Sequence, residues 1–276
     1  MRQRVETLLR MQQQQQQQQH QPASDDGISN EDLAPDTPKD LGRVTMGTFH
    51  SICAKILRYN GDLLASLPSL EKDLEGRNRD LSVNLDSNFA ILDAGDQLRV
   101  LKECLDEAEI DLKNSAVKPL QILSAIGTIK EAKTQGKDPF LQVDEQGKKM
   151  PIPKPLQYAR NVYGSYREKL LTNNALDFDD LIFLTRESLI FYPKLREVLH
   201  RRWPHVLVDE FQDTSITQMD LVKLLTSRSL LVVGDADQAI YAWRGAHAGI
   251  ISDFRTEFQE FAVDGVHTVY LKENYR

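Results

Sequence analysis

The sequence predicts an α/β fold with a parallel sheet, on the strength of three neighbouring patterns. The apolar segment 206–208 is typical of a strand, and it ends in two adjacent carboxylates, Asp209 and Glu210. A second apolar segment of the same kind covers residues 230–233. Between them, residues 216–225 carry apolar side chains at helical spacing. Strand, helix and strand in close succession form a βαβ unit, so the two strands should be parallel neighbours.

Polar side chains follow both strands at the same edge of this sheet. Asp209 and Glu210 come after the first strand, and Asp237 and Gln238 come shortly after the second. In an open parallel sheet, ligands bind beyond the carboxyl ends of the strands. Proteins hold Mg²⁺ with one or two carboxylates together with phosphate oxygens of a substrate. The pattern therefore predicts a nucleotide-hydrolysis edge, and the alternative is a set of solvated acids that merely follow two strands.

Four segments resemble motifs of the UvrD/PcrA/Rep family of superfamily 1 DNA helicases. Asp-Glu-Phe-Gln-Asp-Thr at 209–214 resembles motif II, and the segment 234–246 resembles motif III. Gly-Thr-Phe-His-Ser at 47–51 looks like motif Ib, and Glu-Asn-Tyr-Arg at 273–276 looks like the start of motif IV. Because the four motifs occur in the family's order, the resemblance is specific, and it covers about residues 41–276.

The resemblance implies an α/β fold with a RecA-like parallel sheet of the P-loop NTPase type, incomplete here, and an inserted all-helical subdomain. Residues 41–49 and 204–276 would form part of the RecA-like ATPase domain, and 50–203 the helical subdomain. Residues 1–10 are similar to the end of the helix that follows motif Ia. The family's phosphate-binding sequence Gly-x-x-x-x-Gly-Lys-Ser/Thr, or Walker A, does not occur in these 276 residues. We therefore expect a fragment of the first motor domain, without Walker A and the second motor domain, that does not work as a motor by itself.

The resemblance also implies roles for individual residues. Asp209 would hold Mg²⁺, Glu210 would act as general base toward the attacking water, and Gln238 would sense the γ-phosphate of ATP. Arg276 would place a cation against the γ-phosphate, and Tyr275 would stack on the adenine. The residues expected to contact single-stranded DNA are Thr48, Phe49, His50, Tyr241, Trp243 and Arg244.

Several of these assignments have structural alternatives. Trp243 would otherwise be an anchor of the core, and His50 an ordinary histidine at the start of a helix. Tyr275 and Arg276 would otherwise be surface residues without a role. We expect Phe178, in the stretch Leu-Asp-Phe-Asp-Asp, to be structural rather than DNA-contacting.

Residues 11–40 differ in composition from the rest of the chain. Residues 12–19 are an unbroken glutamine run, followed by polar, proline-bearing sequence. Such composition does not bury enough apolar surface to fold, so we expect a disordered insert between motifs Ia and Ib. A glutamine run favours a nuclear protein, with an organelle or the bacterial cytoplasm as the alternative location.

Apolar spacing predicts several helices in the middle of the chain. Asp93 is placed as an N-cap, and the acidic stretch 177–180 favours a helix start. Residues 134–155, rich in Gly, Pro and Lys, should form a loop. The expected helices cover residues 49–64, 98–105, 120–133, 158–171 and 181–189.

The composition is that of a globular protein with a sizeable core. The chain has 276 residues, of which 41% are hydrophobic and 27% charged, which suits one large or two medium domains. No stretch approaches the length of a membrane span, and the N-terminus lacks the apolar core of a secretory signal. Cys53 and Cys104 lack metal-ligand spacing, so we expect reduced core thiols of an intracellular protein.

The net charge of −7 does not point to a nucleic-acid partner, so the local distribution of charge decides. Residues 41–60 contain only basic charges, and residues 194–202 carry four bases and one acid. Such patches can neutralise phosphates. The alternative is that they are solvated helix faces.

The resemblance implies part of an ATP-dependent DNA helicase or translocase that moves 3′ to 5′ on single-stranded DNA in repair or recombination. Its cofactors would be ATP and Mg²⁺, and its partners single-stranded DNA, DNA junctions and repair or recombination proteins. One alternative is a catalytically inactive DNA-binding or regulatory remnant of such a helicase. Another is a relative whose motor serves a nuclease or an anti-recombinase.

Overall fold

The computed structural model describes residues 44–64, 67, 85–113, 115–141, 147–238, 249–259 and 265–271. By their contacts, Met1–Met46 and Gly47–Arg276 are two separate units, and all the helices and strands below belong to the second. The insert expected at 11–40 and the helix end expected at 1–10 lie outside the described residues.

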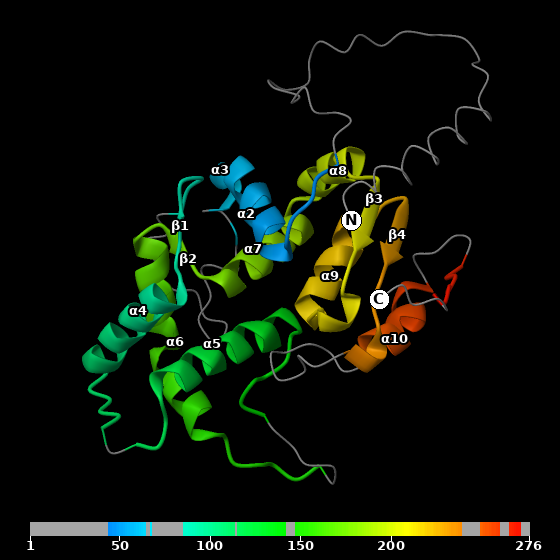
Figure 1. Ribbon diagram of the computed structural model, residues 1–276. Helices are drawn as coiled ribbons and strands as arrows, with labels where there is room; N and C mark the ends of the chain where they lie inside the picture. The colour runs from blue at the N-terminus through cyan, green and yellow to red at the C-terminus, as the bar shows by residue number, and fades with distance from the viewer. Residues whose placement is uncertain are drawn as a thin grey trace, which may run out of the picture. The chain divides into compact units, whose positions relative to one another are not determined.

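The second unit has a mixed α/β fold in which helices predominate and the described strands form two short parallel pairs (Figure 1). In chain order its elements are α2 (Phe49–Tyr59), α3 (Gly61–Leu64), β1 (Ala90–Ile91), α4 (Ala94–Glu107), α5 (Pro119–Thr134), α6 (Lys154–Thr172), β2 (Ala175–Leu176), α7 (Phe178–Phe191), α8 (Pro193–Arg202), β3 (His205–Val208), a 3₁₀ turn (Phe211–Asp213), α9 (Ile216–Leu225), β4 (Ser229–Val232), a second 3₁₀ turn (Ala236–Gln238) and α10 (Ile250–Phe258).

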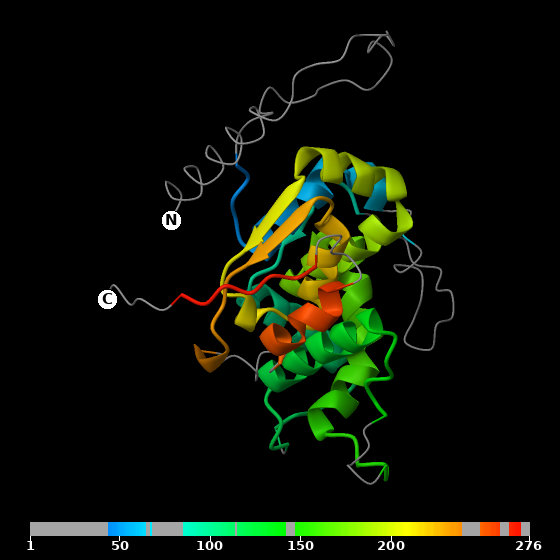
Figure 2. The ribbon, with the colours of Figure 1, turned by 90° about the vertical axis from the view of Figure 1, so that its right-hand side faces the viewer.

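The predicted βαβ unit is confirmed as β3, α9 and β4. The two strands pair in parallel, with Val206 opposite Leu230 and Val208 opposite Val232. Apolar residues of α9 and α10 pack with Val208 on one face of this pair. Figure 2 shows helices along one side of the β3–β4 pair. On the other face, Leu207 and Leu231 are 46% and 52% exposed. The strands are therefore amphipathic, with one face packed into a core.

The helix expected at 49–64 is divided into α2 and α3 at Asn60. The Asn60 side chain donates a 2.7 Å hydrogen bond to the Ile56 carbonyl and so ends α2. At Gly61 a Cβ atom would lie 2.4 Å from the backbone nitrogen of Ser87, so only glycine fits. The close approach of another segment thus divides the helix, although its apolar pattern continues.

Helices α4, α5 and α6 pack around a shared apolar core. The expected helices at 98–105 and 120–133 are confirmed within α4 and α5. Asp93 is the N-cap of α4, since its Oδ1 accepts a 2.8 Å hydrogen bond from the Asp96 amide. The helix expected at 158–171 starts earlier, at Lys154, because proline suits the first turn of a helix.

A small strand pair corrects the expectation of an all-helical subdomain. β1 and β2 are parallel, with Ala90 opposite Ala175 and Ile91 opposite Leu176. Asn174, at a φ of 49°, directs the chain from the end of α6 into β2. A strand of two residues is too short to show a period-2 pattern, so the sequence does not predict this pair.

The two cysteines lie in the core, as expected. Cys53 and Cys104 are fully buried free thiols. Burial raises the pKa of Cys53 to about 12, so its thiol stays protonated at neutral pH. In the described part of the chain, every helix is too short or too polar to cross a bilayer.

Candidate active site

The two carboxylates at the end of β3 lie on an exposed turn. Asp209 Oδ1 accepts a 3.1 Å hydrogen bond from the Glu210 amide. Glu210 has a φ of 52°, in the left-handed region that costs a non-glycine residue about 1–3 kcal/mol. The same conformation occurs at Glu109 and Asn174, where the chain leaves a helix. At Glu210 it instead places a functional candidate on a strained turn.

Gln212 links the turn after β3 to the turn after β4. Its side chain is 3% exposed, and Nε2 donates a 2.8 Å hydrogen bond to Glu210 Oε2. Its Oε1 accepts a 3.1 Å bond from the Asp235 amide. One buried amide therefore holds the Glu210 carboxylate and the segment after β4 at the same edge of the sheet.

Gly234 makes room for this amide. A Cβ atom at Gly234 would lie 2.7 Å from Gln212 Oε1, closer than side chains pack. Asp235 continues the hydrogen-bonded chain, because its Oδ2 accepts a 2.7 Å bond from Gln238 Nε2. Glu210, Gln212, Asp235 and Gln238 are thus connected through side-chain and backbone hydrogen bonds.

Backbone hydrogen bonds and aromatic packing hold the turn after β3 in place. The Val233 amide donates to the Val208 carbonyl at 2.8 Å, and the Phe211 amide donates to the Val233 carbonyl at 2.9 Å. The Phe211 side chain is fully buried and meets Phe254 edge-to-face, with ring centroids 5.5 Å apart. The strand pairing therefore continues past the strand ends as far as the carboxylates.

Helix α9 begins directly after the turn. The Ser215 side chain and Gln218 form a capping box at its N-terminus. The Asp213 amide donates to the Glu210 carbonyl at 3.0 Å, which joins the strained residue to the segment that leads into α9. Among the described residues, the buried Oδ1 of Asp213 has no hydrogen-bond partner. It is an oxygen acceptor at this edge that the described side chains do not use.

The donor set fits a hard cation and a phosphate-bearing ligand. Asp209 and Glu210 supply exposed carboxylate oxygens, and the buried Oδ1 of Asp213 supplies a further oxygen close by in the sequence. Within the described ranges no three His, Cys, Asp or Glu side chains gather as a ready metal cage. Mg²⁺ keeps water and substrate phosphates among its ligands, so one or two carboxylates suffice for it.

The expected DNA-contacting residues at 48–50 lie at the start of α2. Thr48 is its N-cap, with Oγ1 accepting a 3.2 Å hydrogen bond from the Ser51 amide. Phe49 and His50 are half-buried. The His50 ring meets the Phe178 ring edge-to-face, with centroids 5.6 Å apart. Burial lowers the pKa of His50, and the smaller effect of the Asp179 carboxylate opposes it. His50 is therefore a mostly neutral imidazole at neutral pH.

Phe178, which we expected to be structural rather than DNA-contacting, packs against His50 and also reaches the surface. Its side chain is 45% exposed, at the first position of α7 beside His50. The exposed aromatic surface at the start of α2 is therefore larger than the motif alone predicts. The basic residues of the two predicted patches include Lys55 and Arg58 on α2 and Lys194 and Arg201 on α8, all exposed. Their exposure agrees equally with phosphate binding and with solvated helix faces.

A buried charge cluster lies behind Phe178 at the start of α7. Lys130 Nζ lies 2.6 Å from Asp177 Oδ2 and 2.7 Å from Asp180 Oδ1, and all three side chains are buried. The Tyr166 hydroxyl donates to Asp177 Oδ2 at 3.2 Å. Asp177 and Asp180 also cap α7. Sequence reasoning recognised the helix start but missed Lys130, which is 47 residues from Asp177.

The remaining expected site residues lie outside the described residues. They are Tyr241, Trp243, Arg244, Tyr275 and Arg276. Gln212 lies within motif II, but the resemblance implies no role for it, and its bridge depends on strand register that the sequence alone does not reveal. The one sequence signal for it was Gly234, which permits the close approach.

Comparison with known proteins shows the family of this chain. The model of the UvrD/REP helicase N-terminal domain matches residues 1–259. ATP-dependent DNA helicase PcrA of Bacillus subtilis is 37% identical over 235 residues, which are 84% of this chain and 27% of that protein. PcrA proteins of Staphylococcus aureus and Staphylococcus epidermidis are each 34% identical, again over 84% of this chain and 28% of their own length. The chain thus spans little more than a quarter of these relatives, and it belongs to the UvrD/REP helicase N-terminal domain family.

Proposed function

We propose that this chain is part of an ATP-dependent DNA helicase or translocase that moves 3′ to 5′ on single-stranded DNA in repair or recombination. In this proposal β3 and β4 are two strands of a RecA-like sheet. The ATPase domain comprises residues 41–49 and 204–276, and residues 50–203 form the inserted, mainly helical subdomain. A nuclear location and repair or recombination partners, including DNA junctions, belong to the same proposal.

The observation that carries the proposal is the bridge through Gln212. General-base catalysis needs a carboxylate whose position is fixed relative to the attacking water. Glu210 is held in a strained backbone conformation and by a hydrogen bond from a buried amide. The same amide contacts the segment that carries Gln238. This arrangement supports Glu210 as the base and Gln238 as the group that senses the γ-phosphate.

The nucleotide would bind across this edge, with Asp209 holding Mg²⁺. When bound, the cation would neutralise the negative charge that develops on the phosphates. Glu210 would orient the attacking water and accept its proton. Arg276 would stabilise the transferred phosphoryl group, and Tyr275 would stack on the adenine.

Single-stranded DNA would run past the start of α2. Thr48, Phe49 and His50 would contact backbone and bases, with Tyr241, Trp243 and Arg244 on the same track. Aromatic rings stack on any base, which suits a motor that must move along every sequence. The exposed ring of Phe178 supports this track, because it adds a further aromatic surface beside His50.

A second candidate is a DNA-binding or regulatory protein without ATP turnover. The exposed ring of Phe178 beside His50 fits this candidate, because stacking on DNA needs no bound nucleotide. Fluorescence anisotropy with labelled oligothymidine and an ATPase assay on the 276-residue chain test both candidates. We expect DNA binding without DNA-stimulated hydrolysis by this chain.

Hydrolysis itself is tested in a hybrid in which this chain replaces the matched segment of Bacillus subtilis PcrA. The helicase proposal requires DNA-stimulated ATP hydrolysis by the hybrid and its loss in Glu210→Gln. A well-folded hybrid that binds DNA but does not hydrolyse ATP would favour the second candidate.

A further inference from the structure

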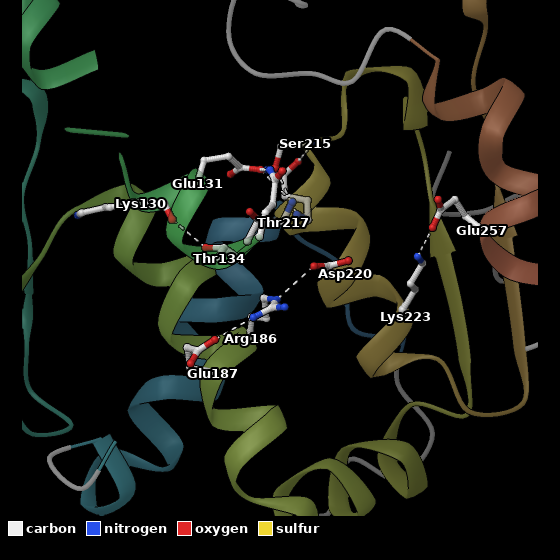
Figure 3. Close-up of polar contacts among 12 residues, drawn as sticks. Lys130, Glu131, Thr134, Arg186, Glu187, Ser215, Thr217, Asp220, Lys223 and Glu257 are labelled. Atoms are coloured by element: carbon white, nitrogen blue, oxygen red, sulfur yellow. Dashed lines mark hydrogen bonds and ion pairs between the residues drawn. The ribbon is translucent and has the colours of Figure 1, made fainter. Parts of the chain in front are cut away.

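Helix α5 contacts the start of α7, which lies beside His50, and the start of α9, which follows the Glu210 turn. Lys130 and Glu131 are consecutive on α5, and their side chains point in different directions (Figure 3). Lys130 enters the buried cluster with Asp177 and Asp180 at the start of α7. Glu131 reaches the start of α9 instead. One turn of α5 therefore contacts both helices.

Glu131 supplies an acceptor that α9 lacks. Its Oε1 accepts a 3.2 Å hydrogen bond from the Thr217 amide. Thr217 lies in the first turn of α9, where backbone amides have no partner within the helix. The Ser215 side chain serves the Gln218 amide, so Glu131 serves a different one. Its negative charge also faces the positive end of the helix dipole.

The start of α9 is tied to Glu210 over a short distance. Between Glu210 and Ser215 the chain forms the 3₁₀ turn, closed by the bond from the Asp213 amide to the Glu210 carbonyl. The Thr214 amide donates to the Phe211 carbonyl at 3.1 Å. A shift of the α9 N-terminus would therefore move the Glu210 turn.

The other end of this connection lies at the exposed aromatic surface. Phe178 and Asp179 occupy the first two positions of α7, directly after the capping residue Asp177 that Lys130 binds. The Asp179 carboxylate lies within electrostatic range of both His50 and Glu131. At Gly127 of α5, a Cβ atom would lie 2.9 Å from Asp179 Oδ2, so the two helices approach closely there.

We propose that Glu131 is a positioning residue that transmits DNA binding at His50 and Phe178 to the turn of Glu210, through the buried Lys130 cluster and the N-terminus of α9. The inference rests on the proposed function and describes how DNA binding would regulate the turn of Glu210. DNA that engages Phe178 fixes the start of α7, and the Lys130 cluster then fixes α5. Glu131 holds the first turn of α9 in place, and the Glu210 turn, already held by its own packing, opens less often.

Hydrogen–deuterium exchange of the 276-residue chain, with and without oligothymidine, tests this inference. In the unsubstituted chain, DNA should slow exchange of the amides in 211–218. In Glu131→Ala the Thr217 amide should exchange about fivefold faster without DNA, because one hydrogen bond is lost. The DNA-dependent slowing at 211–218 should also disappear, while DNA affinity changes less than twofold.

Two further variants make the test specific. Glu131→Gln keeps an oxygen acceptor in place, so it should restore most of the DNA response even if Glu131→Ala folds poorly. Lys223→Ala removes the contact of α9 with Glu257 on α10, and it should retain the full DNA response. A merely structural role for Glu131 would instead speed exchange throughout α5 and α9 without abolishing the response to DNA.

The outcomes separate this inference from the proposed function. DNA binding that leaves 211–218 unchanged, or a response that survives in Glu131→Ala, overturns the role of Glu131 alone. A chain that does not bind oligothymidine overturns the proposed DNA track and this inference with it.

Discussion

Replacing Lys130 with methionine should destabilise the chain strongly at neutral pH. Lys130 is 4% exposed and is the cation between two buried carboxylates, Asp177 and Asp180. Removing one partner of a buried ion pair leaves uncompensated charge and costs about 3–5 kcal/mol. For a domain of this size each kcal/mol shifts the melting temperature by about 2–4 °C, so the expected drop is roughly 6–20 °C.

The loss should depend on pH in a defined direction. Burial and then the charge of Asp177 raise the pKa of Asp180 to about 6, even with Lys130 present. The stabilising contribution of Asp180 is therefore complete below its unfolded pKa and is lost as the pH rises toward 6. Burial also disfavours the ionised form of Asp177, but the Lys130 ammonium and hydrogen bonds hold its pKa below the usual value. Without Lys130 both pKa values should rise, so Lys130→Met should recover stability between pH 7 and pH 5.

Thermal unfolding followed by circular dichroism at pH 5, 6 and 7 measures this effect. Lys169→Met is the matched control, because Lys169 also contacts two carboxylates, Glu103 and Glu107, but in a solvated position. Exposed ion pairs contribute little, so the control should melt close to the unsubstituted chain at every pH. Equal melting temperatures for Lys130→Met and Lys169→Met, or a loss that does not vary with pH, would refute the account of the buried cluster.

Three further predictions concern the candidate site. In the PcrA hybrid, Glu210→Gln should abolish ATP hydrolysis while sparing ATP binding, because an amide cannot take the proton from water. Asp209→Asn should instead weaken Mg²⁺-dependent nucleotide binding. Near-normal ATP turnover in both variants would exclude the assignment of the two carboxylates. Gln212→Ala should lower the stability of the 276-residue chain by about 2–4 kcal/mol through the loss of two hydrogen bonds, one to a charged group. In the hybrid the same change should slow ATP hydrolysis roughly 100-fold, the effect expected when a catalytic group is displaced by about 1 Å. A variant with lower stability but full turnover would show that Gln212 does not position Glu210. In the hybrid, Trp243→Ala should lose about 1–3 kcal/mol of affinity for single-stranded DNA, equally on thymine and mixed-sequence strands, with little change in melting temperature. A loss of about 3–5 kcal/mol in folding stability would instead place Trp243 in the core.

The parallel β3–α9–β4 unit could be predicted because its signal is local. Each strand is a short apolar run, and α9 has an apolar stripe between them. The requirement that close, parallel strands be joined by a helix then leaves few topologies. The shared position of the polar residues at one edge of the sheet can be predicted as well, since side chains that follow neighbouring parallel strands lie close together. The sequence therefore suffices to place the two carboxylates at the end of β3.

The contacts that fix these side chains could not be predicted in the same way. Gln212 meets Asp235 only because Val208 lies opposite Val232, and a different register would separate them. Lys130 on α5 meets Asp177 at the start of α7, 47 residues further along the chain, and a lysine in an apolar helix pattern would ordinarily be placed on the surface. Both interactions depend on tertiary packing, which periodicity does not encode.

Energetic balance at the Glu210 turn explains how the chain keeps a carboxylate in a strained conformation. The left-handed backbone costs about 1–3 kcal/mol. Full burial of the adjacent Phe211 contributes about 1.5–3 kcal/mol, and its edge-to-face contact with Phe254 about 0.5–1.5 kcal/mol. The hydrogen bond from Gln212 to the carboxylate adds to this, so the packing beneath the turn is sufficient to offset the strain. Because Phe211 and Gln212 immediately follow Glu210, the residues that stabilise the strained turn also fix the direction of its side chain. Under the proposed function, a base held in this way would not need to be ordered by the nucleotide, and the binding free energy of the nucleotide would remain available for closing the site around the phosphates.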